Sequence, residues 1–218
     1  MLILLPPSEG KSSPETGKAL NLNTLTAARE LRDARTIALQ GFQALDRSCA
    51  RPAHEIYSGV LYQSLDWQNL PPAAQARGEK SIIIISALFG IVGINDAICS
   101  YKAKIKNSIW RDPVAFYLEA RKDDLIVDAR SSTYQGIWTP PSEKTICIRV
   151  FQIKGGKKSV ITHMSKKYRG ELVRWILQKK SPTTPEELYE IASQKFRCTL
   201  TPAKKKEPWF LDLLIEVS

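Results

Sequence analysis

The sequence has little of the side-chain chemistry that builds metal centres or disulfide frameworks. It contains only two histidines, His54 and His163, and its four cysteines are widely spaced, with no C-x-x-C pair. No H-x-x-x-H or D-x-D run accompanies the two histidines. We therefore predict no metal and no cofactor, and we expect four free thiols.

Long hydrophobic runs are also missing. The longest begins at residues 82–85 and continues through residues 87–89, which is far short of a membrane span. Residues 1–5 are apolar but too short for a signal peptide, and they run directly into Pro6 and Pro7. We expect a cytoplasmic protein without a membrane partner. The 218 residues and the 43% hydrophobic composition predict one globular domain over residues 1–218.

Acidic residues are in the minority. Lysine and arginine number 32 against 22 aspartates and glutamates, which gives a formal net charge of +10. An excess of positive charge favours an acidic partner such as a nucleic acid, although a basic protein with no such partner has the same composition.

Strand-like and helix-like patterns are mixed along the chain and predict an α+β fold. The clearest strand covers residues 81–87, where four consecutive isoleucines indicate burial on both faces. Residues 88–98 resemble a hairpin of short helical turns. Further strands are expected at residues 1–5, 100–106, 125–128, 145–153, 159–163 and 207–217, and helices at residues 24–49, 112–122, 166–179 and from Thr184 onward.

Polar residues follow several of these strands. If the strands share one sheet edge, the side chains after them converge in one cleft. These side chains are Ser8, Lys11, Ser86, Asp128, Arg130, His163 and Lys166.

The segment at residues 161–177 changes from strand-like to helical where Lys166, Lys167, Arg169 and Arg174 gather. Backbone N–H groups and cations at a helix start suit a phosphate or another polyanion. A lysine crowded by other cations loses its proton more readily, so Lys166 is also a candidate Schiff-base nucleophile.

Other motifs are incomplete or ambiguous. Residues 10–12 imitate the end of a phosphate-binding loop but lack its leading glycine, and Ser86 has no G-x-S-x-G elbow of the kind that a hydrolase triad uses. Lys102, Lys104 and Lys106 alternate with less polar residues, which indicates either a face for a phosphate backbone or a protected sheet edge.

Five motifs in order, LLPPSEGK, YSGVLY, SALFGIVGINDAICSYK, VDARSSTY and SKKYRGELVRWIL, resemble the YaaA-like peroxide stress protein family over nearly the whole chain. This resemblance implies a single α+β domain with a central mixed sheet flanked by helices, a helix-hairpin-helix-like element and a basic cleft. It also implies binding to double-stranded or branched DNA and a role in limiting iron-dependent oxidative damage. No catalytic activity is implied.

The resemblance also suggests which residues line the cleft. It implies Gly59, Gly90 and Gly170 together with Lys11, Tyr57, Ser86, Asp96, Tyr101, Lys102, Asp128, Arg130, Ser132, Tyr134, Lys166 and Arg169, to which the basic segment adds Lys167. This chain departs from the family pattern where Gly93 and Ile94 stand in place of an arginine and a proline, and where Lys102 replaces an arginine. A lysine does not reproduce the bidentate phosphate contact of an arginine.

Three functional classes remain open at this level. The first is a DNA-binding protein of the peroxide stress response. The second is an enzyme acting on a nucleobase or nucleotide through a Lys/Asp pocket, and the third is a basic scaffold for acidic proteins. Asp128, which follows a buried strand, needs a nearby cation such as Lys11, Arg130 or Lys166 to stay ionised. A ligand pocket and a structural ion pair both meet that need.

Overall fold

The computed structural model describes residues 1–161 and 164–217, and His163 lies outside them. Its strands form a mixed eight-stranded sheet in the order β4-β3-β1-β6-β7-β10-β9, with β8 paired to β7, and a separate two-stranded sheet of β2 and β5. This arrangement confirms the α+β fold. The strands are β1 (Leu2–Leu5), β2 (Arg51–Pro52), β3 (Ile82–Ser86), β4 (Gly90–Gly93), β5 (Ala97–Ile98), β6 (Ile126–Asp128), β7 (Thr145–Lys154), β8 (Lys157–Val160), β9 (Cys198–Thr201) and β10 (Trp209–Glu216).

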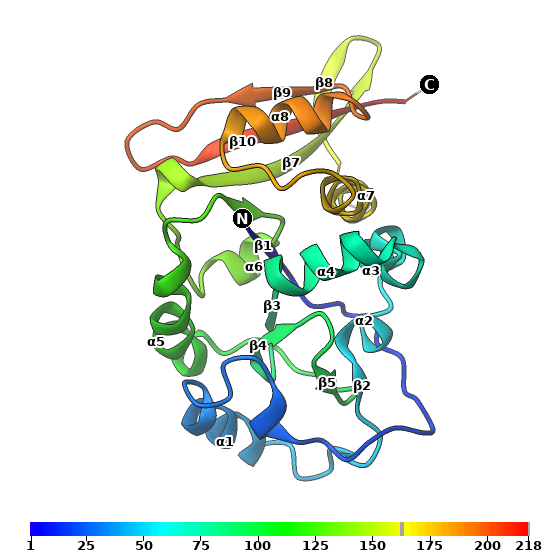
Figure 1. The fold of residues 1–218 in the computed structure, drawn as a ribbon, viewed down its shortest axis with the longest axis vertical. Helices are drawn as coiled ribbons and strands as arrows, with labels where there is room; N and C mark the ends of the chain where they lie inside the picture. Colours follow the sequence, from blue (N-terminus) through cyan, green and yellow to red (C-terminus); the bar gives the residue numbers. More distant parts are fainter. Residues whose placement is uncertain (162–163, 218) are drawn as a thin grey trace.

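Helices surround this sheet, as Figure 1 shows. The longest, α7, packs against α3, α4 and α8 as well as against β7. The helices are α1 (Arg32–Gln40), α2 (Ala53–Ile56), α3 (Val60–Leu65), α4 (Pro72–Ser81), α5 (Asn107–Leu118), α6 (Ser132–Gln135), α7 (Ser165–Leu177) and α8 (Pro185–Ser193), with 3₁₀ turns at Leu22–Thr24, Trp67–Asn69, Glu119–Arg121 and Ser142–Lys144.

The centre of the sheet is parallel, and its strands β1, β3 and β6 are buried throughout. Strand β1 lies between β3 and β6, β6 lies beside β7, and β7 lies beside β10, all in parallel. The four residues of β1 and the five of β3 are all buried, as expected for apolar strands covered on both faces. The carboxyl ends of β1, β3 and β6 therefore lie at one edge, where Ser86 and Asp128 are the last residues of their strands.

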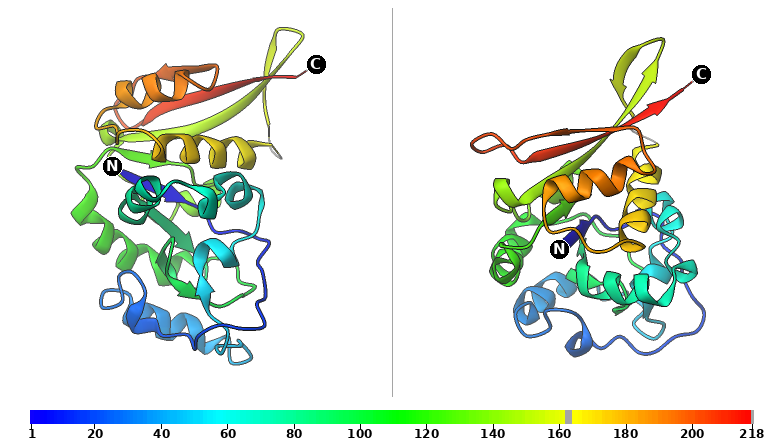
Figure 2. Two further views of the ribbon diagram at one scale, coloured as in Figure 1. Left: turned by 45° about the vertical axis from the view of Figure 1, so that its right-hand side comes forward. Right: turned by 45° about the horizontal axis from the view of Figure 1, so that its top comes forward.

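Strand β7 is longer than its neighbours and links two parts of the sheet. Its first residues pair with β6, its last four pair with β8, and β10 runs along eight of its positions. The β7–β8 hairpin turns at Gly155 and Gly156, both at positive φ, and stands away from the rest of the chain in Figures 1 and 2. Along β7, Ile146, Ile148 and Val150 are buried, whereas Cys147, Arg149 and Phe151 are half-buried on the opposite face.

Several expected elements are confirmed. Strands lie near residues 1–5, 82–86, 126–128, 145–154 and 209–216, and helices lie at Ser165–Leu177 and Pro185–Ser193. The Thr184 hydroxyl accepts a hydrogen bond from the Glu187 N–H at 3.2 Å, so Thr184 is the predicted N-cap.

Other expectations are wrong. The only α-helix within residues 24–49 is the nine-residue α1, which is shorter than predicted. Ala27 adopts a positive φ of 56°, which interrupts helical backbone between Thr24 and the start of α1. The hairpin of helical turns predicted over residues 88–98 is instead β4, paired antiparallel to β3, followed by β5. Residues 101–106 form no strand, although the lysines there are exposed and the intervening side chains more buried. The helix-hairpin-helix-like element stays a prediction.

Candidate functional site

The strand ends lead into a cavity of about 780 Å³ between the β6–α6 loop, the first turn of α7 and the half-buried face of β7. Five cations line it, namely Arg130, Arg149, Lys166, Arg169 and Lys206, whereas its acidic lining residues are Glu9 and Asp128. The lining also contains Ser132, Tyr134, Gln135, Trp138, Thr145, Cys147, Phe151, Ser165 and Phe210.

A buried ion pair between Asp128 and Arg130 forms one wall of this cavity. Their side chains are only 3% and 1% exposed. The Arg130 Nε donates to Asp128 Oδ1 and its Nη2 donates to Oδ2, both at 2.9 Å, and the Arg130 backbone N–H donates to Oδ1 at 3.0 Å. Arg130 is therefore the nearby cation that Asp128 was predicted to need in order to stay ionised. The pair is bidentate, which is the strongest geometry for such contacts.

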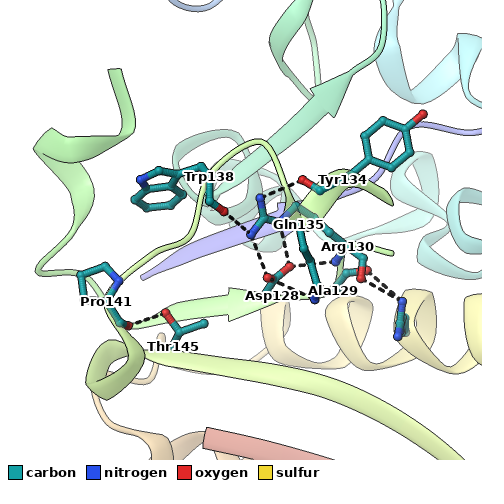
Figure 3. Close-up of polar contacts among 9 residues, drawn as sticks. Asp128, Ala129, Arg130, Tyr134, Gln135, Trp138, Pro141 and Thr145 are labelled. Atoms are coloured by element: carbon teal, nitrogen blue, oxygen red, sulfur yellow. Dashed lines mark hydrogen bonds and ion pairs between the residues drawn. The ribbon is translucent and has the colours of Figure 1, made fainter. Parts of the chain in front are cut away.

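The same arginine shapes the loop that follows β6. Its guanidinium donates to the carbonyl oxygens of Tyr134 and Trp138 at 3.2 and 3.0 Å, as Figure 3 shows. Arg169 reaches the loop from α7 and donates to the carbonyls of Ala129 and Arg130. Arg169 is half-buried near the start of α7, and through these two contacts it holds the loop in place.

Burial shifts the pKa values of two side chains at this wall. Burial lowers the pKa of the Arg169 guanidinium, and the Asp128 carboxylate and the Cys147 thiol oppose that shift. Burial, together with Asp128, raises the pKa of Cys147 to about 12, against the opposing effect of three arginines. Cys147 is therefore a neutral thiol at physiological pH and a poor nucleophile.

A second polar cluster joins Lys11, Tyr57, Ser86 and Tyr101 beside the cavity. The Tyr101 hydroxyl lies 3.0 Å from the Tyr57 hydroxyl and 2.8 Å from Ser86 Oγ, and Lys11 Nζ lies 4.3 Å from the centre of the Tyr101 ring. Burial lowers the pKa of Lys11, which Glu9 opposes, and burial raises the pKa of Tyr101 to about 12. Lys11 Nζ donates to the Ser8 carbonyl at 2.6 Å. The described lining of the cavity does not include these four side chains.

Three predicted cleft residues lie elsewhere. Asp96 accepts hydrogen bonds from the backbone N–H groups of Thr26 and Gly93 at 2.7 and 2.9 Å, so it fixes a turn. Lys102 lines a smaller hollow of about 430 Å³ together with Cys49 and Tyr101. Lys167 pairs with Glu171 on α7 at 3.8 Å.

Close packing explains three of the glycines. A Cβ atom at Gly170 would meet the Leu61 carbonyl of α3, and one at Gly59 would meet Ser8 Oγ, whose hydroxyl accepts from the Gly59 N–H at 2.8 Å. At Gly93 a Cβ atom would lie 2.9 Å from Thr26 Oγ1. Thr26 therefore packs closely against Gly93, the last residue of β4, and the following residue, Ile94, is buried in the core.

Sequence reasoning missed the contribution of β7 and β10 to the site. Arg149, Phe151 and Phe210 line the cavity. The only local signal was the alternation within residues 145–153, whose half-buried face carries an arginine and an aromatic ring in place of ordinary polar residues.

Two of the expectations concern metal binding and membrane insertion. Among residues 1–161 and 164–217, no group of three His, Cys, Asp or Glu side chains is placed to hold a metal ion. In the same ranges, no helix has the length and apolar character to cross a membrane.

Comparison with known proteins assigns the family. The model of the family described as peroxide stress protein YaaA matches residues 18–201. The chain belongs to this peroxide stress protein family. A UPF0246 protein of Streptomyces coelicolor is 34% identical over 99% of this chain and 98% of its own length. A UPF0246 protein of Corynebacterium efficiens is 33% identical over 88% of this chain and 91% of its own length. This membership supports a role in peroxide stress.

Proposed function

We propose that this member of the YaaA family binds double-stranded or branched DNA through the cation-lined cavity and its rim, where Lys166 and Lys206 are exposed, and in this way limits iron-dependent oxidative damage. The observation that carries the proposal is the charge of the cavity, where five cations face two carboxylates. One of those carboxylates, Asp128, is already neutralised by Arg130. The remaining excess of positive charge suits a chain of phosphates.

Two further features support a phosphate ligand. Ser165, Lys166 and Arg169, from the N-terminal part of α7, line the cavity, and the N-terminus of a helix favours anions. The second feature is the exposure of Lys166 and Lys206, because exposed ammonium groups can approach a phosphate backbone without losing a partner in the core.

The alternative of an enzyme with a Lys/Asp pocket has less support. Both carboxylate oxygens of Asp128 accept hydrogen bonds from Arg130, so they are engaged in a structural pair. Lys166 is exposed, so it lacks the desolvation that activates many Schiff-base lysines. Borohydride trapping of a carbonyl substrate on Lys166 would revive this alternative.

The proposal is tested by measuring the affinity of a labelled duplex and a labelled four-way junction over a range of salt concentrations. Binding through phosphates predicts that log K falls linearly with log salt, with a slope of about −0.9 for each phosphate contact. The double variant Lys166→Gln/Lys206→Gln should make this slope shallower by about 1.8 if each lysine makes one contact.

The matched control is Lys180→Gln/Lys195→Gln, which removes two exposed lysines that do not line the cavity. It should leave the slope unchanged. Weak salt dependence in the unmodified protein, or equal effects of the two double variants, would refute binding through the cavity. Cells carrying the Lys166→Gln/Lys206→Gln protein should also survive peroxide less well than cells carrying the control.

A further inference from the structure

Lys11 lies in a loop that is bound to a second segment of the chain. Its backbone forms an antiparallel bridge with Tyr57. The backbone N–H groups of Ser12 and Ser58 donate across this bridge at 2.8 and 3.2 Å. The backbone of Lys11 is therefore held in one position.

The amine at the end of the Lys11 side chain is also fixed. Its Nζ donates to the Ser8 carbonyl at 2.6 Å, and it lies 4.3 Å from the centre of the Tyr101 ring and 5.7 Å from that of Tyr57. Both tyrosines are buried, with 5% and 1% exposure, and their hydroxyl groups are hydrogen-bonded to each other. The amine is thus held by one carbonyl acceptor beside two fixed aromatic rings.

The burial of the Lys11 amine changes its protonation. The side chain is half-buried, and burial lowers the pKa of the amine, whereas Glu9 raises it by less. Among the residues that the structure describes, no carboxylate forms an ion pair with Lys11. The rings attract a charged amine, but they also keep water away from it. At neutral pH a larger share of Lys11 is therefore uncharged than of an exposed lysine.

The uncharged amine of Lys11 is suited to attack a carbonyl group. It has two N–H bonds and one lone pair, and the Ser8 carbonyl accepts one of the N–H bonds. The lone pair is then free to attack the carbonyl carbon of an aldehyde. A C–N bond forms, one amine proton moves through water to the aldehyde oxygen, and the resulting carbinolamine loses its hydroxyl group as water. The product is an imine, and the reaction needs neither an oxidant nor a reductant.

The surroundings of Lys11 limit the size of its reaction partner. Glu9, Gly10 and Ser12 beside it are exposed, so a molecule can approach from the solvent. Lys11 is not part of the described lining of either cavity, so a bulky ligand finds no recess around the amine. A small aldehyde needs no such recess.

We propose that Lys11 forms an imine with a small aldehyde and is thereby a reactive site separate from the cation-lined cavity. This inference does not depend on DNA binding. Aldehydes are products of oxidation, so the reaction agrees with the role of the family in peroxide stress.

The test incubates the full chain with glycolaldehyde and then reduces any imine with borohydride to a stable secondary amine. Peptide mass spectrometry measures the adduct at Lys11 and at Lys18, an exposed lysine of the same N-terminal segment. At pH 7 Lys11 should be modified faster than Lys18. The ratio of the two rates should fall as the pH rises towards 10.5, the ordinary pKa of lysine, because an exposed amine then also loses its proton.

Two pairs of variants make the test specific. Lys11→Arg keeps the positive charge but cannot form the imine, so the fastest phase of total aldehyde uptake, followed by intact mass, should be lost. Lys18→Arg should keep that phase. Glu9→Gln removes the charge that opposes deprotonation of Lys11, so it should speed the modification of Lys11 at pH 7. Glu15→Gln, which changes another exposed glutamate of the same segment, should not.

The outcomes decide the proposal. Preferential modification of Lys11 at pH 7 that disappears at high pH supports it. Equal rates at Lys11 and Lys18 at pH 7, or a ratio that does not change with pH, would refute it. Trapping of Lys11 on a DNA duplex with one abasic site, without any glycolaldehyde adduct, would overturn the assignment to a small aldehyde. Failure to bind DNA would leave this inference standing and would refute the proposed function alone.

Discussion

Replacing Asp128 by asparagine tests whether the Asp128–Arg130 pair is structural. Asparagine has nearly the same shape, but it removes the negative charge and places an NH₂ group where one carboxylate oxygen accepts from Arg130. Arg130 is 1% exposed, so its charge would be left buried without a counterion. The loop carbonyls of Tyr134 and Trp138 would still accept from it, but they carry no net charge.

The magnitude follows from this burial. Removing one partner of a buried ion pair costs about 3–5 kcal/mol, because the other charge stays desolvated. A typical protein has a total stability of about 5–15 kcal/mol, so the variant would lose a large part of it. For a chain of this length, each kcal/mol corresponds to a fall in Tm of about 2–4 °C. We therefore expect Asp128→Asn to lower Tm by about 6–20 °C.

Urea unfolding of Asp128→Asn beside Asp66→Asn measures the effect. Asp66 pairs with Arg174 but is 41% exposed, so the same chemical change there should cost less than about 1 kcal/mol. If Asp128→Asn is as stable as this control, the pair does not stabilise the fold. If that stable variant also loses peroxide protection, Asp128 acts in function and the structural interpretation is wrong.

Three further predictions concern single side chains. Burial raises the pKa of Cys147 from 9.0 to about 12, so at pH 8 its thiolate fraction is about 1,000-fold lower than that of an ordinary cysteine. Iodoacetamide and peroxide should therefore modify Cys147 far more slowly than Cys49. Equal modification of the two cysteines in mass spectrometry would contradict this. Gly170→Ala should cost about 1–3 kcal/mol in urea unfolding because the methyl group meets α3, whereas Gly41→Ala, with open space around the site, should cost nothing comparable. Burial lowers the pKa of His54 below 6.5, so the unfolded chain binds a proton at His54 more tightly than the folded chain does. The stability that comes from the neutral, buried His54 is present above pH 6.5 and is lost as the pH falls through the folded pKa. His54→Gln should therefore make the stability of the protein depend less on pH in this range.

The sequence predicts those parts of the fold whose signal is local. Four consecutive isoleucines are sufficient for β3, and Gly155-Gly156 between two alternating segments is sufficient for the β7–β8 hairpin. Helix α1 is shorter than predicted because the segment before it is held by tertiary contacts. Arg35 donates to the carbonyl of Thr26, nine positions earlier, and to those of Phe89 and Ile91, which lie 54 and 56 positions further along the chain. No periodicity in residues 24–49 reports those contacts.

In the site, too, contacts between residues close in sequence are predictable and contacts between distant residues are not. Asp128 and Arg130 are two residues apart, so a carboxylate after a buried strand and a neighbouring cation suggest their pairing directly. Arg149 and Asp212 are 63 residues apart, and only the parallel register of β7 and β10 brings them together. Lys11 and Lys166 both follow strands in the sequence, yet only Lys166 lines the cavity, because Lys11 folds back over Tyr101.

The position of β1 in the middle of the sheet has a consequence for how the chain acquires its fold during translation. Ile3 pairs with Ile82, and Leu4 pairs with Asp128, which are 79 and 124 positions further along. At a synthesis rate of about 5–20 residues per second, the apolar Leu2–Leu5 segment is synthesised at least about 6 s before its second neighbour. Until β6 is made, one edge of this segment has no native partner strand, and unpaired apolar strands make nascent chains prone to aggregation. The strand that is made first is thus completed late, and this chain should depend on chaperones that hold its N-terminal residues during synthesis.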